Sequence, residues 1–256
     1  MEVVNVVTHA MEKGLRSYQE DRYFHKRISK YGRTGYLLAV MDGHNGDTAA
    51  KTCFQLLEKT FSIRKGGDAE NALRRLVDKL ANVTHQFISG TCITVAYVDE
   101  MNNHVTVAVL GDCPAVVVDV SGAVNVGPVH NVRTNIQERK NAEERGGQYD
   151  LGGYIFNTKG SYGLQIGRSL GDYQMDGITS REPEVYTVKN PRFVALVTDG
   201  VLEIGRRYEN ELVKGFVEMS AKNTTATELL DFTKGLFELR DNATIVLWQK
   251  NVVSIW

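Results

Sequence analysis

Short apolar runs rich in β-branched and aromatic residues restrict the fold of this chain more than any other feature, because such runs are typical of strands. They occupy residues 3–8, 36–41, 92–98, 105–110, 115–120, 193–198 and 244–248. Short turns join 92–98, 105–110 and 115–120, which predicts an antiparallel meander. The strands come in groups instead of alternating singly with helices, so we predict an α+β fold.

Apolar residues at helical spacing predict helices between and after these strands. The predicted helices cover residues 45–64, 68–87, 135–145, 210–221 and 225–239. Asn45 or Asp47 is available as the N-cap of the first, and Thr225 with Glu228 forms a capping-box signature at the last. Because the helix over 68–87 has one apolar and one charged face, we expect helices on the outside of a layered sandwich.

Composition indicates one domain without a strongly charged partner. The 256 residues include four prolines and no linker-like tract, so we predict a single catalytic domain over 1–256. Lys and Arg number 30 against 31 Asp and Glu, which argues against binding to nucleic acid or to an anionic membrane. The chain shows neither a membrane-spanning run nor a signal peptide, and its three cysteines lack C-x-x-C spacing. We expect a cytoplasmic or nuclear monomer whose cysteines are buried.

Aspartates stand at the ends of several predicted strands. These are Asp42, Asp112, Asp199 and Asp241. Strand ends of one sheet converge, and carboxylates gathered there repel one another unless a cation neutralises them. Hard oxygen ligands, with no competing cluster of His and Cys, predict Mg²⁺ or Mn²⁺. An isolated Asp-Gly pair is more often a turn, so this prediction depends on the joint pattern.

Two further residues indicate phosphate chemistry at this place. Gly43 leaves its carbonyl accessible to an ion, and His44 follows at once with a side chain that can donate a proton near neutral pH. Arg16 offers a planar fork that suits phosphate oxygens. Taken singly, the alternatives are a solvent-exposed turn histidine and an ordinary surface arginine.

Short motifs over nearly the whole chain follow one another in a characteristic order. Residues 14–22 read GLRSYQEDR, and residues 38–46 read LAVMDGHNG. The others are SGT at 89–91, GD at 111–112, IGRSLGD at 166–172, PEV at 183–185, VTDGV at 197–201 and RDNAT at 240–244. In this order the motifs resemble those of the metal-dependent protein phosphatases, the type 2C serine/threonine phosphatases.

The resemblance implies a fold and a metal centre. The implied fold is an antiparallel β-sandwich flanked by helices, in α-β-β-α layers, with two Mg²⁺ or Mn²⁺ ions at one end. Asp42 would bridge both ions and the Gly43 carbonyl would bind one of them. Asp199 and Asp241 would bind the other.

The resemblance also implies a mechanism. Glu20 and Asp21 would act on the ions mainly through bound water. A water or hydroxide between the ions would attack phosphorus in line, while Arg16 grips the phosphoryl group and His44 protonates the leaving serine or threonine oxygen. The implied substrates are phosphoproteins.

Some positions depart from the family pattern. The motif G-D-S-R reads GDCP at 111–114, and residues 87–89 read FIS where many members carry an aspartate, which argues against a third ion. Asp172 is the candidate ligand if such an ion binds, and the alternative for Asp172 is a helix-capping or turn carboxylate. Residues 173–182 correspond to a short flap beside the active site.

Three other functions are consistent with parts of the pattern. A pseudophosphatase would keep the fold as a regulatory binding module, but it has no need of Arg16, His44 and the gathered carboxylates. A phosphohydrolase with an aspartyl nucleophile would need an acid two residues after the nucleophile, where His44 and Val201 stand. A small-molecule phosphatase of the same fold stays open, because the chemistry at phosphorus does not depend on what carries the leaving oxygen.

Overall fold

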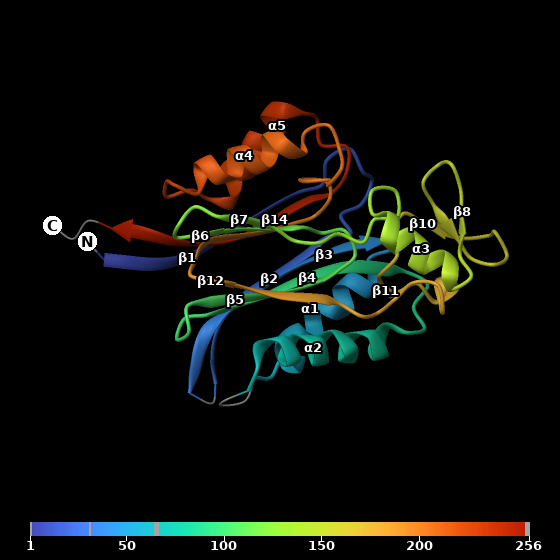
Figure 1. Ribbon diagram of the computed structural model, residues 1–256, viewed down its shortest axis with the longest axis horizontal. Coiled ribbons are helices and arrows are strands. Elements are labelled where there is room, and N and C mark those ends of the chain that lie inside the picture. The colour runs from blue at the N-terminus through green and yellow to red at the C-terminus, as the bar shows by residue number, and fades with distance from the viewer. Residues whose placement is uncertain (1, 31, 64–66, 254–256) are drawn as a thin grey trace.

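Two antiparallel sheets pack face to face, with helices on both outer sides (Figure 1). The computed structural model describes residues 2–30, 32–63 and 67–253. The first sheet has the order β1 (Glu2–Glu12), β14 (Ala243–Val253), β13 (Pro191–Val197), β6 (Ala115–Asp119) and β7 (Val124–Val126). The second has the order β12 (Glu184–Lys189), β5 (His104–Leu110), β4 (Gly90–Asp99), β3 (Arg33–His44) and β2 (Arg22–Lys30), with β11 (Leu170–Gly171) paired to β4.

The helices cover the two sheets from outside. Helices α1 (Thr48–Thr60) and α2 (Ala69–Thr84) pack on the second sheet, and α4 (Glu209–Met219) and α5 (Ala226–Leu236) pack on the first. Helix α3 (Ile136–Glu144) lies beside a small sheet of β8 (Gln148–Tyr149), β9 (Ile155–Phe156) and β10 (Gly163–Leu164), and a 3₁₀ turn spans Tyr173–Met175. The predicted α-β-β-α layers are confirmed.

Burial on both faces of the sheets explains the continuous apolar runs. In β13, Val194 and Leu196 belong to the core between the sheets, whereas Phe193, Ala195 and Val197 belong to the core under α4 and α5. Side chains alternate between the two faces of a strand, so a strand with a layer on each side is apolar at every position. These central strands were therefore predictable.

The helix caps agree with the prediction in part. Thr225 and Glu228 form the expected capping box at α5. Asp47 is the N-cap residue of α1, but its side chain makes no capping hydrogen bond and instead pairs with Arg22 at 2.5 Å. Arg64, the last residue of the predicted first helix, lies outside the described residues.

The predicted meander is wrong in its third strand. Strands β4 and β5 pair as expected, but β6 pairs with β13 and β7 in the opposite sheet. The chain crosses between the sheets at residues 111–114, where the Val197 amide donates to the Pro114 carbonyl at 3.1 Å. Because strands of both sheets are equally apolar, the local pattern does not distinguish them.

Two edge strands, β2 and β12, were not predicted from the sequence. Their charged residues, including Lys26, Arg27 and Lys189, break the apolar pattern. Such charges protect an exposed edge from pairing with another chain. Within the described part of the chain, no helix is long and apolar enough to span a membrane.

Candidate metal centre and active site

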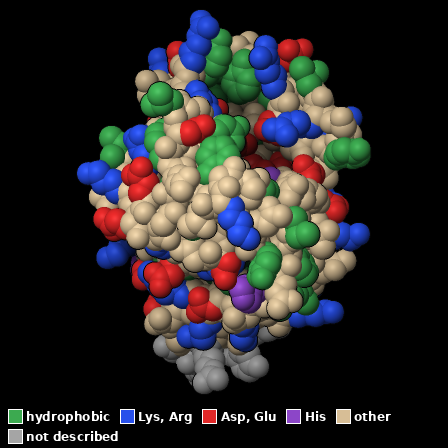
Figure 2. Space-filling view, turned by 90° about the vertical axis from the view of Figure 1, so that its right-hand side faces the viewer, with side chains coloured by type: hydrophobic (Ala, Val, Ile, Leu, Met, Phe, Trp, Pro, Cys, Tyr) green, Lys and Arg blue, Asp and Glu red, His purple; other side chains and the backbone are tan. Residues whose placement is uncertain are grey.

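Carboxylates from both sheets meet at one end of the sandwich. Asp42 lies near the end of β3, Asp199 just after β13 and Asp241 just before β14. With Arg16 and His44 they line a cavity of about 210 Å³. Figure 2 views this end and shows a hollow with acidic side chains and a histidine at its floor. The structure thus gathers residues that are far apart in the sequence.

Most of the predicted site residues line this one cavity, and two lie behind it. The lining includes Arg16, Glu20, Asp42, Gly43, His44, Asp199 and Asp241. Asp21 and Asp172 are fully buried and do not line it.

Two glycines let the segments of the site approach each other. A Cβ on Gly200 would lie 2.0 Å from the Asn242 carbonyl oxygen, and one on Gly43 would lie 2.6 Å from the Glu20 carbonyl oxygen. A side chain at either position would push the segments apart. The glycines therefore bring the motifs at 197–201 and 240–244, and those at 14–22 and 38–46, into contact.

Asn242 holds the loop that carries Arg16 and Glu20. Its Nδ2 donates to the carbonyls of Lys13 and Tyr18, both at 2.9 Å, and its Oδ1 accepts from the Glu20 amide at 2.7 Å. The Glu20 carboxylate also accepts from an amide of the DGHNG turn at 2.6 Å. The sequence analysis gave Asn242 no role, and its place in the RDNAT motif was the only signal.

The buried carboxylates have raised pKa values. Burial and the charge of Asp199 raise the pKa of Asp42, and burial and the charge of Asp112 raise that of Asp199. Burial raises the pKa of Asp21 to about 7, against the hydroxyls of Thr244 and Thr198 that donate to its Oδ2. The raised pKa values mean that these carboxylates are buried close to one another without enough positive charge nearby to stabilise their ionised forms.

The donor set fits a hard divalent cation. Oδ1 of Asp21 is buried without a hydrogen-bond partner among the described residues, and Asp42 and Asp199 contribute further carboxylate oxygens, which Mg²⁺ and Mn²⁺ prefer. Within the described ranges, however, no three His, Cys, Asp or Glu side chains already form a metal cluster. Asp241 is paired with Arg16, whose Nη2 lies 2.5 Å from its Oδ2.

His44 is paired with Asp172. The Nε2 atom of His44 lies 2.9 and 2.8 Å from the two carboxylate oxygens, and the Tyr162 hydroxyl donates to the same carboxylate at 3.1 Å. Burial lowers the pKa of His44, but the hydrogen bond and charge of Asp172 outweigh it and leave the pKa raised. Asp172 stands at the N-cap position of the 3₁₀ turn, but its carboxylate makes no capping hydrogen bond there and contacts His44 instead.

Hydrogen bonds with His130 and Asn131 hold the turn that carries Asp112. The Gly111 amide donates to His130 Nδ1 at 3.0 Å, and Asn131 Nδ2 donates to Asp112 at 2.9 Å. His130 Nε2 lies 2.9 Å from Glu184. Because Nδ1 accepts a hydrogen bond, the proton belongs on Nε2 and the ring is neutral. Burial and the charge of Arg168 keep the pKa of His130 below its usual value.

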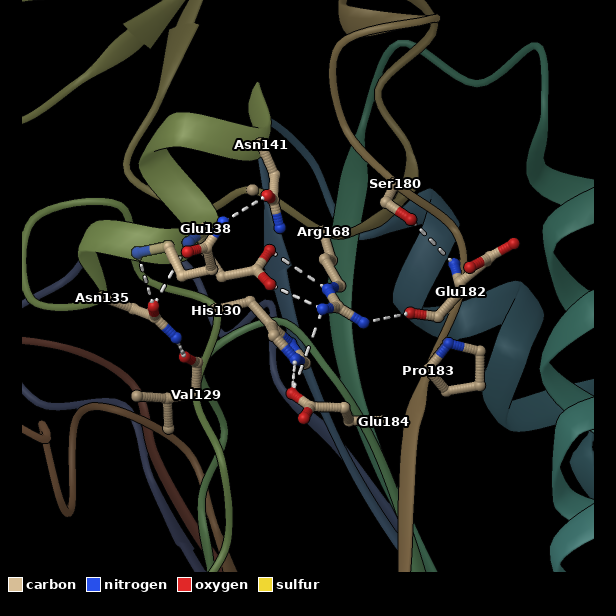
Figure 3. A network of polar contacts seen from close by, with 12 residues as sticks. Val129, His130, Asn135, Glu138, Asn141, Arg168, Ser180, Glu182, Pro183 and Glu184 are labelled. Atoms are coloured by element: carbon tan, nitrogen blue, oxygen red, sulfur yellow. Dashed lines mark hydrogen bonds and ion pairs between the residues drawn. The ribbon is translucent and has the colours of Figure 1, made fainter. Parts of the chain in front are cut away.

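Arg168 connects this histidine to α3 (Figure 3). Its guanidinium binds both carboxylate oxygens of Glu138, at 2.5 and 3.1 Å, and donates to the Glu182 carbonyl at 2.9 Å. Glu184 lies 3.9 Å away on the other side. The motifs IGRSLGD and PEV, to which the sequence analysis gave no role beyond Asp172, therefore support the turn under Asp112.

The predicted flap is in the wrong place. Tyr154 and residues 163–166, from the small sheet and its connection, line the cavity of the site. Tyr173, Gln174 and residues 176–178 instead line a separate cavity of about 460 Å³. The apolar pattern of the three two-residue strands in the small sheet is too short to be recognised in a sequence.

Comparison with known proteins identifies the family of this chain. The family described as Protein phosphatase 2C matches residues 5–238. A probable protein phosphatase 2C 2 of Arabidopsis thaliana is 27% identical over 201 residues, which cover 74% of this chain and 52% of the plant protein. A probable protein phosphatase 2C 3 of Oryza sativa subsp. japonica is 30% identical over 171 residues, which cover 60% and 35%. The chain thus spans about half the length of these relatives or less.

Solved structures show the same fold. The serine-threonine phosphatase 2C of Toxoplasma gondii has a TM-score of 0.73 at 17% identity and covers 98% of this chain and 99% of its own. A C. elegans sex determining protein has a TM-score of 0.77 at 23% identity, covering 95% of this chain and 64% of its own. The family match spans almost the whole chain, and the chain belongs to the protein phosphatase 2C family.

Proposed function

We propose that this chain hydrolyses phosphate monoesters on serine and threonine residues of proteins. The observation that carries the proposal is the convergence of Asp42, Asp199 and Asp241 with Arg16 and His44 around one cavity. These are the groups that a metal-dependent phosphatase needs, and they occur in a chain of a phosphatase family. A small-molecule phosphatase would share this chemistry but would not need a protein substrate.

We assign the carboxylates to two Mg²⁺ or Mn²⁺ ions. Asp42 and the Gly43 carbonyl would hold one ion, and Asp42, Asp199 and Asp241 the other. Glu20 and Asp21 would act through water. When bound, the ions would supply positive charge that lowers the pKa of an attacking water and offsets the charge of the phosphoryl oxygens.

The side chains of this chain would carry the remaining steps. Arg16, at the cavity rim, can give its planar fork to two phosphoryl oxygens in place of Asp241. His44 can donate a proton to the leaving serine or threonine oxygen, which needs a proton to depart. Because Nε2 faces Asp172, the proton that the protonated ring would donate is the one on Nδ1. Asp172 would act as a positioning residue that orients the His44 ring and stabilises its protonated form. This assignment is preferred to a role of Asp172 at a third ion, because both its oxygens face His44.

The test is hydrolysis of a phosphothreonine peptide by the purified chain with Mn²⁺ or Mg²⁺, before and after addition of EDTA. We expect activity that requires metal and disappears with the chelator. Asp199→Ala should remain folded by circular dichroism and should lose both the activity and the binding of Mn²⁺. A folded wild-type chain that binds Mn²⁺ but hydrolyses no phosphate ester would instead be a pseudophosphatase.

A further inference from the structure

A second and larger cavity adjoins the proposed metal centre. It has a volume of about 540 Å³ and shares Asp199 and Asp241 with the cavity of the site. Its other walls come from the loop between β13 and α4, from α4 itself and from the segment between α5 and β14. In Figure 2 the surface above the acidic hollow, toward α4 and α5, carries basic and hydrophobic side chains. A chain bound at the metal centre can therefore continue into this cavity.

One wall of the second cavity is apolar and ordered. The rings of Tyr208 and Phe237 stack with their centroids 5.4 Å apart, and Leu212 of α4 also lines the cavity and is almost fully buried. A stacked aromatic pair is already rigid. Binding of a ligand against it therefore costs little conformational entropy of the two side chains. The volume lies in the range of pockets that bind small ligands, so it has room for a side chain of a bound substrate.

Among the described residues, some charged side chains on the cavity walls have ion-pair or hydrogen-bond partners within the protein, and others have none. Glu203 forms an ion pair with Arg206 at 2.6 Å, and Glu209 accepts from the Gly205 amide at 2.6 Å. These three side chains therefore satisfy one another or the backbone. They leave little charge for a ligand.

Two other arginines are not compensated in this way. Arg207 lies over the Tyr208 ring, 5.2 Å from its centroid, and neither Arg207 nor Arg240 forms an ion pair with any described residue. Glu238 is the one lining carboxylate, apart from those of the site, that makes no such contact within the described ranges. The rim next to the metal centre thus offers two free guanidinium groups above an apolar wall.

We propose that this second cavity binds the part of a phosphoprotein substrate beside the phosphorylated residue, and that Arg207 and Arg240 select an acidic side chain there. The proposal deepens the proposed phosphatase function and rests on it. The two cavities share Asp199 and Asp241, so the acidic side chain belongs close to the phosphoresidue in the substrate sequence. Its methylene groups would lie on the wall of Tyr208 and Phe237.

The experiment compares phosphothreonine peptides that differ at a single position, from three residues before to three after the phosphothreonine, with Glu, Ala or Lys there. For the wild-type chain with Mn²⁺ we expect kcat/KM to be about three- to tenfold higher for the Glu peptide than for the Ala peptide at one or more positions. A partly exposed ion pair between a carboxylate and a guanidinium group contributes a free energy of that size. The preference should shrink in high salt, because salt screens exposed charges.

Variants of Arg207 identify the cavity as the cause. Arg207→Ala should lose part of the preference, because Arg240 remains, and Arg207→Glu should shift it toward Lys, while hydrolysis of p-nitrophenyl phosphate stays unchanged. The matched control is Arg75→Ala on the exposed side of α2, on the other outer layer, which should keep the wild-type preference.

Three outcomes would overturn the proposal in distinguishable ways. Equal rates for the Glu, Ala and Lys peptides in the wild type would show that the cavity selects no charge. A preference for Glu that is undiminished in Arg207→Ala and in Arg207→Glu would place the selection outside this cavity. If neither the peptides nor p-nitrophenyl phosphate are hydrolysed, the proposed phosphatase function fails, and the proposed subsite fails with it.

Discussion

Arg16 and Asp241 are held together, with Nη2 of the arginine 2.5 Å from Oδ2 of the aspartate, although 225 positions separate them in the chain. The proposed phosphate-binding group and a proposed metal ligand therefore neutralise each other. Their side chains are 57% and 38% exposed, and ion pairs of that exposure contribute little free energy. The pair can be exchanged easily for contacts with phosphate and metal.

Replacement of Arg16 separates these two roles. For Arg16→Ala we expect kcat/KM for a phosphothreonine peptide to fall by about 10- to 100-fold, because hydrogen bonds to a charged group are lost. The Mn²⁺ concentration for half-maximal activity should not rise, because Asp241 loses a competitor. Arg16→Lys should recover only part of the rate, since an ammonium lacks the bidentate fork. A rise in the Mn²⁺ requirement would contradict this assignment.

The contribution of His44 to kcat should be larger for substrates whose leaving group is more basic. His44→Ala should keep its affinity for Mn²⁺ and lower kcat for a phosphothreonine peptide by about 10²- to 10⁴-fold, the usual contribution of a general acid. The loss with p-nitrophenyl phosphate should be much smaller, because nitrophenolate leaves without a proton. Equal losses with both substrates would rule out proton donation by His44.

Asp172 is expected to act only through His44. Asp172→Asn should lower kcat for the phosphothreonine peptide. It should also move the alkaline limb that His44 contributes to the pH profile to lower pH, because the charge of Asp172 no longer raises the pKa of His44. The double variant Asp172→Asn with His44→Ala should be no slower than His44→Ala alone, since residues that act as a unit are not additive. A further loss in the double variant would give Asp172 a separate role, such as binding an ion.

Glu138 makes part of the stability dependent on pH. Burial raises its pKa, but the hydrogen bond and charge of Arg168 outweigh burial and leave the pKa below the usual glutamate value of 4.5. A depressed folded-state pKa adds stability above about pH 4.5, and this stability is lost as the pH falls through the folded-state pKa. We expect Glu138→Gln to lower the free energy of unfolding by about 1 to 3 kcal/mol at pH 7.

Urea unfolding at several pH values checks this prediction. The difference between wild type and Glu138→Gln should shrink below pH 4.5, because the wild-type carboxylate is then protonated. Glu143→Gln, at an exposed position of the same helix, is the matched control and should change little. A difference that is independent of pH would mean that the charge of Glu138 is not what stabilises the fold.

The cysteines should be chemically silent in the native protein. All three, Cys53, Cys92 and Cys113, are free and buried, as the sequence analysis predicted. Burial raises the pKa of Cys53 to about 12, and only the thiolate reacts readily. Ellman's reagent should therefore find no thiol in the native chain and three in guanidinium chloride. Fast reaction of a native thiol would show that its surroundings open in solution.

The sequence by itself determined the central strands, the main helices and the motifs that carry the site. Strands such as β13 are apolar at every position because they are covered on both faces, and the capping box of α5 is a local contact between Thr225 and Glu228. Such features depend on neighbours along the chain. The motif residues could be named in advance because their order matches a known family.

Only the tertiary structure decided which of these residues contact one another. The crossing of the chain to β6, the pairing of His44 with Asp172 and that of Arg16 with Asp241 join positions far apart in the sequence. The charged edge strands β2 and β12 and the second cavity have no local apolar pattern either. Their positions follow from how two sheets and four helices pack, because a long-range contact is fixed by the geometry of the whole core and not by the residues next to it in the chain.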